Sequence, residues 1–578
     1  MDEASMQAGL AILEKAGSDF AIDVADGWGA LGNAAYNRYD NAGAAIAYQK
    51  ALTFKKGEQR INLLGKLAKV TTFDGNAEAL SYADEGLQIL SAASKPNKDL
   101  LAAFHTLHAR TLLNQGNAKD AYKELKTALT LSGGLTTRTT LSEVSLRNDL
   151  AMAAMLVGDK DEARLYLAYT GAGRIAKSPF SRAVSMDPPL CGEETGLRPD
   201  DVAVVEFSIA DDGSVASAQT VYSRGSPQVA AAFGEAVSGW YWRPEDIAAI
   251  PAFYRLLTRV ELRCSNVLDS GPGVMAPLRQ RYKEWASSHL SSFAVTEDSQ
   301  VKIATTLHTL ADASAAKGDV MGQIAALGWL AEAEQASGQK RISIANEALS
   351  LAAKASVPQE VVNWLRIQRQ LASIADERRR SRYNSDDLRA MVVLADDPAI
   401  AQDALAADTL ILSAARGWNS TKIREAPELL LKVAEDRRLQ EHHPLRQLAW
   451  LDLAGKAAEE GDRTKAQDYF TRTGLTEEQC ALLGEAPTMK RDNVSSNDYP
   501  MEAFMMGFEG WVRMEYDITT NGKTTNARPL VAYPPLIFVD AATGMAKNLQ
   551  YNVSYRPGNS LACSAERQTI NFVIPQNH

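Results

Sequence analysis

Few residues of this 578-residue chain stand in combinations that support catalysis or metal binding. Ser314 and Lys317 match Ser-x-x-Lys, the nucleophile signature of penicillin-recognising enzymes, but no Ser-Asp-Asn or Lys-Thr-Gly partner follows them. We therefore interpret the pair as a chance match in an alanine-rich helix. His105 and His108 could share one helix face and bind a metal ion, yet no third ligand lies near them in the sequence. These residues predict no catalytic site, no metal site and no bound cofactor.

The four cysteines form no Cys-x-x-Cys pair, so their spacing argues against zinc. Cys191 and Cys264 bracket one segment of the chain, and Cys480 and Cys563 bracket another. We predict that each bracketing pair forms a disulfide, because the other pairings would tie separate segments together. Disulfides would place the protein in an oxidising compartment. Buried, reduced cysteines in a cytosolic protein are the alternative.

Composition and charge argue against several classes of protein. Asp and Glu outnumber Lys and Arg by 71 to 61, and the resulting net charge of -10 disfavours nucleic acid as a partner. No apolar run approaches the roughly 18 residues of a membrane helix, so no membrane span is expected. The amino terminus, Met1 to Ser5, lacks the basic and apolar regions of a secretory signal. The protein is therefore expected to be periplasmic with its signal peptide removed or, alternatively, cytoplasmic.

Two kinds of sequence alternate along the chain, and they define the elements expected to position any site. Residues 1–175 and 274–475 are rich in Ala, Leu, Glu and Lys, with apolar residues recurring every three or four positions, which predicts helices. Residues 186–266 and 480–578 carry alternating apolar residues and Asp-Gly or Asn-Gly turn signals, which predict strands and hairpins. The predicted fold class is therefore α+β multidomain, with two helical blocks alternating with two small mixed modules.

The helical segments contain a repeated pattern of large and small residues. One copy comprises Trp28-x2-Leu31-Gly32, Ala44, Tyr48 and Ala51, and a second comprises Trp450-x2-Leu453-Ala454, Ala457, Gly461, Ala466 and Phe470. The pattern resembles the tetratricopeptide repeat, which implies an α-solenoid with a peptide groove. The resemblance places Asn33, Tyr36 and Arg110 in that groove. An ordinary helical bundle is the alternative.

The two mixed segments align with each other without a gap when Gly213 is set on Gly522. Apolar residues at every second position of the first strand then coincide, and Glu206 falls on Glu515. This alternation predicts strands with one buried and one solvated face. A helix follows each hairpin, and one more strand closes each module. The helices are expected at 226–237 and 536–545, and the last strands at 254–263 and 569–574. Each helix leads into an aromatic-Arg-Pro triplet, where proline should end regular structure. The triplets are Trp242-Arg243-Pro244 and Tyr555-Arg556-Pro557.

The second module resembles the TonB carboxy-terminal domain, a periplasmic module that engages a peptide of an outer-membrane receptor. The matching residues are Tyr499-Pro500, Ala503, Gly507, Glu509-Gly510-x-Val512, Ile518, Gly522 and Tyr555-Arg556-Pro557. The first module retains Asp212-Gly213-x-Val215 and the Trp242 triplet, but it has Asp187-Pro188-Pro189 where Tyr-Pro is expected. The sequence shows neither the membrane helix nor the Pro-rich spacer of an energy transducer, so we do not expect energy transduction by this chain alone.

The last strand of the second module is the predicted partner-binding edge. Its alternation points Ile570 and Phe572 inward and Thr569 and Asn571 outward, and an uncovered strand edge can pair with an extended peptide. The resemblance also places Tyr499 and Pro500 near the peptide groove, so the predicted binding segment is Thr569, Ile570, Asn571, Phe572 and Val573. Shielding of this edge by the helical block or by the Val573-Ile574-Pro575 end is the alternative.

These observations predict a periplasmic, non-enzymatic scaffold that binds a protein or an extended peptide. The TonB resemblance links it to outer-membrane transport and suggests an outer-membrane receptor or another envelope protein as the partner. A structural subunit of an envelope assembly and an enzyme with a dispersed site are the two alternatives.

Overall fold

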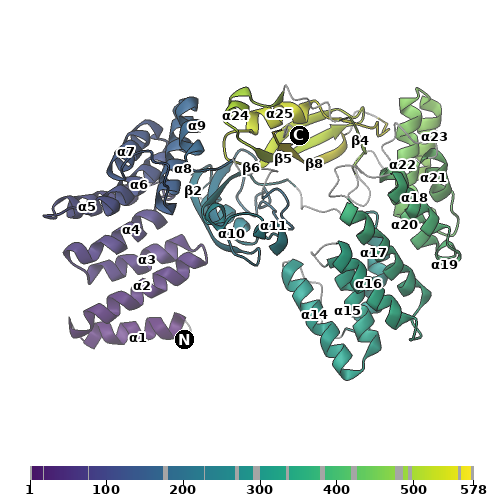
Figure 1. The fold of residues 1–578 in the computed structure, drawn as a ribbon, viewed down its shortest axis with the longest axis horizontal. Helices are drawn as coiled ribbons and strands as arrows, with labels where there is room; N and C mark the ends of the chain where they lie inside the picture. Colours follow the sequence, from purple (N-terminus) through teal and green to yellow (C-terminus); the bar gives the residue numbers. More distant parts are fainter. Residues whose placement is uncertain are drawn as a thin grey trace.

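We describe the protein from a computed structural model. The described residues are 3–16, 18–75, 77–173, 180–226, 228–266, 273–290, 300–333, 338–377, 385–417, 426–475, 486–491, 498–557 and 561–574. The fold is mixed α and β, mostly helical, with antiparallel sheet at its centre and a helical block on either side (Figure 1).

The first helical block lies on the amino-terminal side of the sheet and is built from consecutive helices that pack as antiparallel neighbours. Its helices are α1 (Glu3–Ala16), α2 (Ala21–Asn37), α3 (Asn41–Thr53), α4 (Ile61–Val70), α5 (Glu78–Ser91), α6 (Lys98–Asn114), α7 (Ala118–Leu131), α8 (Leu141–Leu156) and α9 (Lys160–Ala168).

The small residues of the repeated pattern allow these helices to approach closely. Gly32 of α2 faces the ring of Tyr48 on α3, and a Cβ at Gly32 would lie 2.4 Å from that ring. Ala44 and Ala51 of α3 are fully buried in the same core. Gly116 and Gly158 follow α6 and α8 with positive φ, which suits the end of a helix. The assignment of these helices to the tetratricopeptide family stays a prediction.

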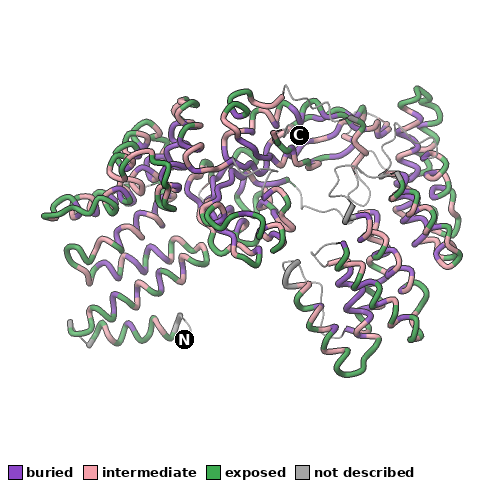
Figure 2. The backbone as a smooth tube through the Cα atoms, in the orientation of Figure 1, coloured by how far each residue is buried: buried purple, intermediate pink, exposed green. Residues whose placement is uncertain are grey.

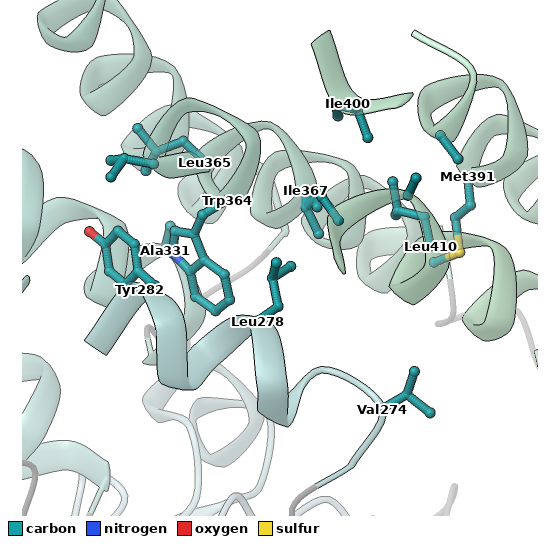
Figure 3. Packing of buried hydrophobic residues seen from close by; sticks show 14 of the residues in the cluster. Val274, Leu278, Tyr282, Ala331, Trp364, Leu365, Ile367, Met391, Ile400 and Leu410 are labelled. Atoms are coloured by element: carbon teal, nitrogen blue, oxygen red, sulfur yellow. The ribbon is translucent and has the colours of Figure 1, made fainter. Parts of the chain in front are cut away.

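The second helical block has a larger continuous core. Its helices are α13 (Ala276–Ser287), α14 (Gln300–Lys317), α15 (Val320–Ala333), α16 (Gly338–Ala352), α17 (Gln359–Glu377), α18 (Ser385–Ala395), α19 (Pro398–Ala401), α20 (Ala404–Gly417), α21 (Ala426–Ala434), α22 (Pro444–Glu459) and α23 (Arg463–Thr473). Trp364 of α17 stacks on Tyr282 of α13 with ring centroids 4.9 Å apart, and Leu278 lies beside them (Figure 3). This aromatic cluster fixes α13 across the following helices.

The mixed segments contribute equivalent sets of strands and helices. The first provides β1 (Val202–Ile209), β2 (Val215–Arg224), α10 (Val229–Ser238), α11 (Pro244–Ala248), α12 (Ala252–Arg255) and β3 (Thr258–Leu262). The second provides β4 (Met489–Arg491), α24 (Met501–Met505), β5 (Gly510–Thr519), β6 (Thr524–Tyr533), α25 (Val539–Lys547), β7 (Gln550–Tyr551) and β8 (Leu561–Phe572). Both therefore have the expected order of strand, strand, helix and strand.

The two modules do not form separate sheets. Their strands join in one six-stranded antiparallel sheet with the order β2-β1-β3-β6-β5-β8, and β4 pairs with β7 in a small second sheet. The joint is formed by β3 and β6, where Glu261 pairs with Ala532 and Leu262 with Val531. Sequence periodicity could not predict this joint because it reports which face of a strand is buried and not which strand lies beside it.

The helices of the two modules cover opposite faces of this sheet. Val205 of β1 packs in one core with α10 and with Trp511 of β5. Val204 and Val512, their neighbours in sequence, pack in a second core with α25 and with the helices of the first block. Figure 2 shows the resulting concentration of buried backbone in the sheet. Because both faces of β1 and β5 are covered, our expectation of one solvated face is wrong for these two strands. Glu515 is buried, and the Glu206 side chain is only 10% exposed.

Two local expectations also need correction. Pro244 does not end regular structure but occupies the first turn of α11, where the missing N–H of proline costs nothing. Tyr254 lies in α12, so the last strand of the first module begins only at Thr258. The last strand of the second module is longer than expected, because it begins at Leu561.

The disulfide predicted for the first module is present. The sulfur atoms of Cys191 and Cys264 are 2.03 Å apart, and Cys264 lies two residues beyond the end of β3. Cys480 lies outside the described residues, so its pairing with Cys563 stays a prediction.

Candidate partner-binding edge of the sheet

A six-stranded open sheet has two outer edges, and in this protein they are formed by β2 and β8. The outer edge of a strand presents N–H and C=O groups that a further strand can pair with. The two edges differ in whether other residues of the chain form hydrogen bonds with these groups.

The β2 edge is capped by the first helical block. The side-chain amide of Asn114, the last residue of α6, accepts a hydrogen bond from the N–H of Ser223 at 2.8 Å and donates one to the C=O of Val221 at 3.2 Å. The Tyr39 hydroxyl donates to the C=O of Ala218 at 3.3 Å. Asn114 thus replaces part of a neighbouring strand. This role could not be predicted from the sequence, since a single asparagine at a helix end is ordinarily solvated or a cap.

The β8 edge is different over its carboxy-terminal half. On its inner side β8 pairs with β5, with Thr569 opposite Arg513, Ile570 opposite Val512 and Asn571 opposite Trp511. Within the described part of the chain, no strand pairs with the outer side of β8. As far as the described residues show, the edge from 568 to 573 is therefore available for pairing.

Side chains along this edge alternate as expected. Ile570 and Phe572 are buried, Asn571 is exposed and Thr569 is half-buried. Val573, just after the strand, is 43% exposed. Beyond it, the N–H of Ile574 is bonded to Glu509 Oε1 at 2.9 Å, which fixes where the free edge ends. Pro575 lies outside the described residues.

Tyr499 and Pro500 lie at the same end of β8. The Tyr499 ring makes edge contacts with Phe504, Phe538 and Phe572, and its hydroxyl donates to the C=O of Phe508. Burial, and then the charge of Glu509, raise its pKa to about 12, so the hydroxyl stays protonated at neutral pH. Tyr499 therefore connects α24 and α25 to β8. Pro500 is half-buried at the start of α24.

An apolar surface adjoins this end of the edge. Met501 is 65% exposed, Met505 is 78% exposed and Phe504 is 46% exposed, whereas Ala503 of the same helix is buried in the core. The helix α24 thus covers the module with one face and presents methionine and phenylalanine to solvent with the other. Flexible methionine side chains suit a surface that must fit a variable apolar partner.

The residues predicted for the solenoid groove are not all available to a ligand. Asn33 is exposed, but its Oδ1 accepts from Tyr48 at 2.8 Å and from Lys66 at 2.9 Å. Tyr36 is half-buried with the Lys69 ammonium 4.7 Å from its ring centre. Arg110 donates to Asp149 at 2.8 Å and to Ser145, so its guanidinium is used in packing α6 against α8.

Arg110 belongs to a buried charge cluster between the first helical block and the sheet. Arg259 of β3 donates to Asp149 at 2.8 Å and forms an ion pair with Glu206 at 2.7 Å. Burial alone would raise the pKa of Glu206, but the charges of Arg259 and Arg110 outweigh it and lower that pKa. Burial, and then the Arg110 charge, lower the pKa of nearby Lys69 to about 8 despite the opposing charge of Glu206. The cluster is internally paired and holds the block against the sheet.

The second module repeats part of this arrangement. Arg567 lies opposite Glu515 in the β5–β8 pairing, as Arg259 lies opposite Glu206 in the β1–β3 pairing. Glu515 also forms an ion pair with Arg528 at 2.6 Å and accepts from Ser265 at 2.6 Å. Because Ser265 follows β3, this carboxylate ties the second module to the end of the first.

From the sequence, two histidines were also considered for metal binding and Lys317 for catalysis. His105 pairs with Glu124 at 2.6 Å, and His108 lies 3.4 Å from Asp84. Lys317 is exposed at the end of α14. Among the described residues, no group of three or more His, Cys, Asp or Glu side chains could hold a metal ion. Of the described helices, none combines the length and apolar character that crossing a membrane requires.

Comparisons with known proteins bear on one part of the chain. No curated protein matches it. A solved structure titled "Circular tandem repeat protein with novel repeat topology and enhanced subunit contact surfaces" is 13% identical over 81% of this chain and 92% of that chain, with a TM-score of 0.18. A TM-score this low leaves fold and function to be argued from the chain's own residues. Residues 495–574 match the family described as the Gram-negative bacterial TonB protein C-terminal, and this segment contains α24, β5 and the whole of β8.

Proposed function

We propose that this protein is a non-catalytic scaffold of the cell envelope and that its carboxy-terminal module binds an extended peptide of a partner protein along β8. The observation that carries the proposal is the difference between the two edges. Asn114 caps β2, whereas the described part of the chain leaves the outer side of β8 from 568 to 573 without a paired strand.

The chain itself contains an example of such pairing. In the first module, β3 occupies the position that β8 occupies in the second, because each is the last strand and lies beside the first strand of its module's hairpin, β1 or β5. The outer edge of β3 receives β6 in antiparallel orientation. We propose that a peptide adds to β8 as β6 adds to β3, with main-chain hydrogen bonds providing the common part of the affinity.

Neighbouring surfaces would provide selectivity. A peptide that extends past Val573 reaches the exposed side chains of Met501, Phe504 and Met505. We therefore expect a partner segment that combines an extended stretch with an apolar residue at one end. The family match supports an outer-membrane receptor or another envelope protein as the source of this segment.

The proposed location is the periplasm. The disulfide between Cys191 and Cys264 requires an oxidising compartment to form and persist, and the TonB family is typical of the envelope. The helical blocks on both sides of the sheet would then serve as the scaffold that positions this edge.

Site-specific photocrosslinking tests the proposal directly. A photoreactive residue replaces Asn571 on the β8 edge or, as a matched control, exposed Ala216 on the β2 edge. The probes are peptides selected on the full chain from a random-peptide display library. We expect crosslinks from position 571 and none from 216. Equal crosslinking at both positions, or crosslinking only from a third probe at Asn33 on the helical scaffold, would show that β8 is not the binding edge.

A further inference from the structure

We propose a second, separate binding site for a small carboxylate with a short apolar chain, located where the second helical block meets the carboxy-terminal module. A cavity of about 800 Å³, its mouth included, lies between α20, α21 and α22 on one side and the segments 487–488 and 552–554 on the other. Small-molecule sites occur preferentially at junctions between domains. The proposal does not depend on peptide binding at β8.

The junction is held together by close backbone contact beside the cavity. Gly455 of α22 lies against the loop after β7, and a Cβ there would be 1.9 Å from the C=O of Val553. Asn552 bonds to Thr488 through both its backbone N–H, at 2.9 Å, and its side chain, at 2.6 Å. These contacts keep the cavity walls in place without filling the cavity.

The helix walls of the cavity are apolar. Ala415, Ala426, Leu430, Leu448 and Leu451 line it from three helices, and all five are buried in the structure. An alkyl chain bound here would be removed from water, with a gain of roughly 0.8 kcal/mol for each buried CH₂ group. The wall thus fits the apolar part of a ligand.

One face of α22 adds a stripe of charges at the edge of this wall. Asp452, Lys456 and Glu459 are spaced by four and three residues, so they lie on the same side of the helix. Asp452 forms an ion pair with Arg416 at 2.7 Å, and Glu459 forms one with Lys490 at 2.7 Å.

Lys456 differs from its neighbours in this stripe. It is half-buried and lines the cavity, and it has no ion pair with any described residue. The carboxylates on either side are already matched by cations. Among the described residues, Lys456 is thus a positive charge without an ion-pair partner beside an apolar wall, and such a site favours an anion with an apolar tail over a neutral or cationic molecule.

Calorimetric titration of the full chain with octanoate tests this site, with 1-octanol and octylamine as neutral and cationic comparisons. We expect saturable binding of one octanoate per chain with a Kd below about 1 mM, and weaker binding of both comparisons. Lys456→Gln should weaken octanoate binding by about tenfold. Lys547→Gln, at an exposed lysine of α25 that does not line the cavity, should leave it unchanged.

A cavity-filling variant provides an independent test. Ala426→Leu places three additional carbons into the apolar part of the cavity, and it should abolish octanoate binding while circular dichroism remains that of the wild type. If Ala426→Leu does not fold, Lys456→Met takes its place. Absence of saturable octanoate binding, equal binding of octanoate and 1-octanol, or octanoate binding unchanged in both Lys456 and Ala426 variants would overturn the proposal.

Discussion

At the scale of single residues, the buried charges between the first helical block and the sheet make the stability of the fold depend on pH. Glu206 is paired with Arg259, and its pKa is lowered because Arg259 and Arg110 outweigh the effect of burial. A carboxyl with a lowered pKa in the folded protein stabilises it above the unfolded pKa, and this stability is lost as the pH falls through the folded pKa. The fold should therefore weaken in acid below about pH 4.

Glu206→Gln tests this contribution. The variant leaves part of the Arg259 charge uncompensated in a buried site, so we expect a loss of about 3 kcal/mol in the free energy of unfolding at pH 7. The free energy of unfolding of the variant, measured with denaturant between pH 3 and pH 8, should also depend less on pH than that of the wild type. Glu235→Gln, at an exposed position of α10, is the control, and it should change neither the free energy of unfolding at pH 7 nor its dependence on pH.

For Asp408 we predict a contribution to stability that depends on pH in the opposite direction. It is 1% exposed in α20, and burial, followed by the charge of Asp436, raises its pKa to about 7. Because the folded pKa is raised, this residue stabilises the fold fully only below its unfolded pKa, and the contribution falls as the pH rises through 7. Asp408→Asn should be more stable than the wild type at pH 8, by about 2 kcal/mol, and not at pH 4. Equal effects at both pH values would contradict this account.

At the scale of elements, the docking of α22 on the carboxy-terminal module depends on one glycine. Gly455→Ala would place a methyl group 1.9 Å from the carbonyl oxygen of Val553, which is backbone and cannot rotate away. We expect a loss of about 1 to 3 kcal/mol by thermal unfolding. Gly544→Ala is the matched control, since it is also helical but meets nothing within 4 Å, and it should gain up to about 1 kcal/mol from helix propensity.

The sequence predicted elements better than it predicted their neighbours. Alternation correctly placed Val205 and Phe207 in a buried strand face, and the turn at Gly213 has the expected positive φ. It failed on Glu206, whose face is covered by a helical block far away in sequence. A strand with an alternating pattern can still be buried on both faces when its charged residues find partners, and only the tertiary structure reveals those partners.

The candidate edge was predicted for the same local reasons. The alternation from Thr569 to Phe572 identified a strand with exposed and buried sides, and the structure agrees. The capping of the opposite edge by Asn114 could not be predicted, because it depends on where α6 ends relative to β2. That capping is what makes the two edges of the sheet different.

At the scale of the whole molecule, both modules share one sheet, so constraints in the first should affect the second. Cys191 and Cys264 close a loop with a sequence separation of 73, which is expected to stabilise the fold by about 4 kcal/mol. Replacing both cysteines with alanine should lower the denaturation midpoint. Because β3 pairs with β6, the loss should also appear in fluorescence from Trp511 on β5. An unchanged Trp511 transition would show that the two modules unfold independently.

Peptide pairing at β8 is the central proposed property of the molecule, and hydrogen–deuterium exchange of the full chain measures it directly. The exchange of each segment is compared with and without a saturating peptide selected from a random-peptide library. If the account is correct, amides from 568 to 573 gain protection on binding, while those of β2, already capped near Ser223 by Asn114, do not change. Protection confined to the helical blocks, with β8 exchanging as it does in the free protein, would contradict it.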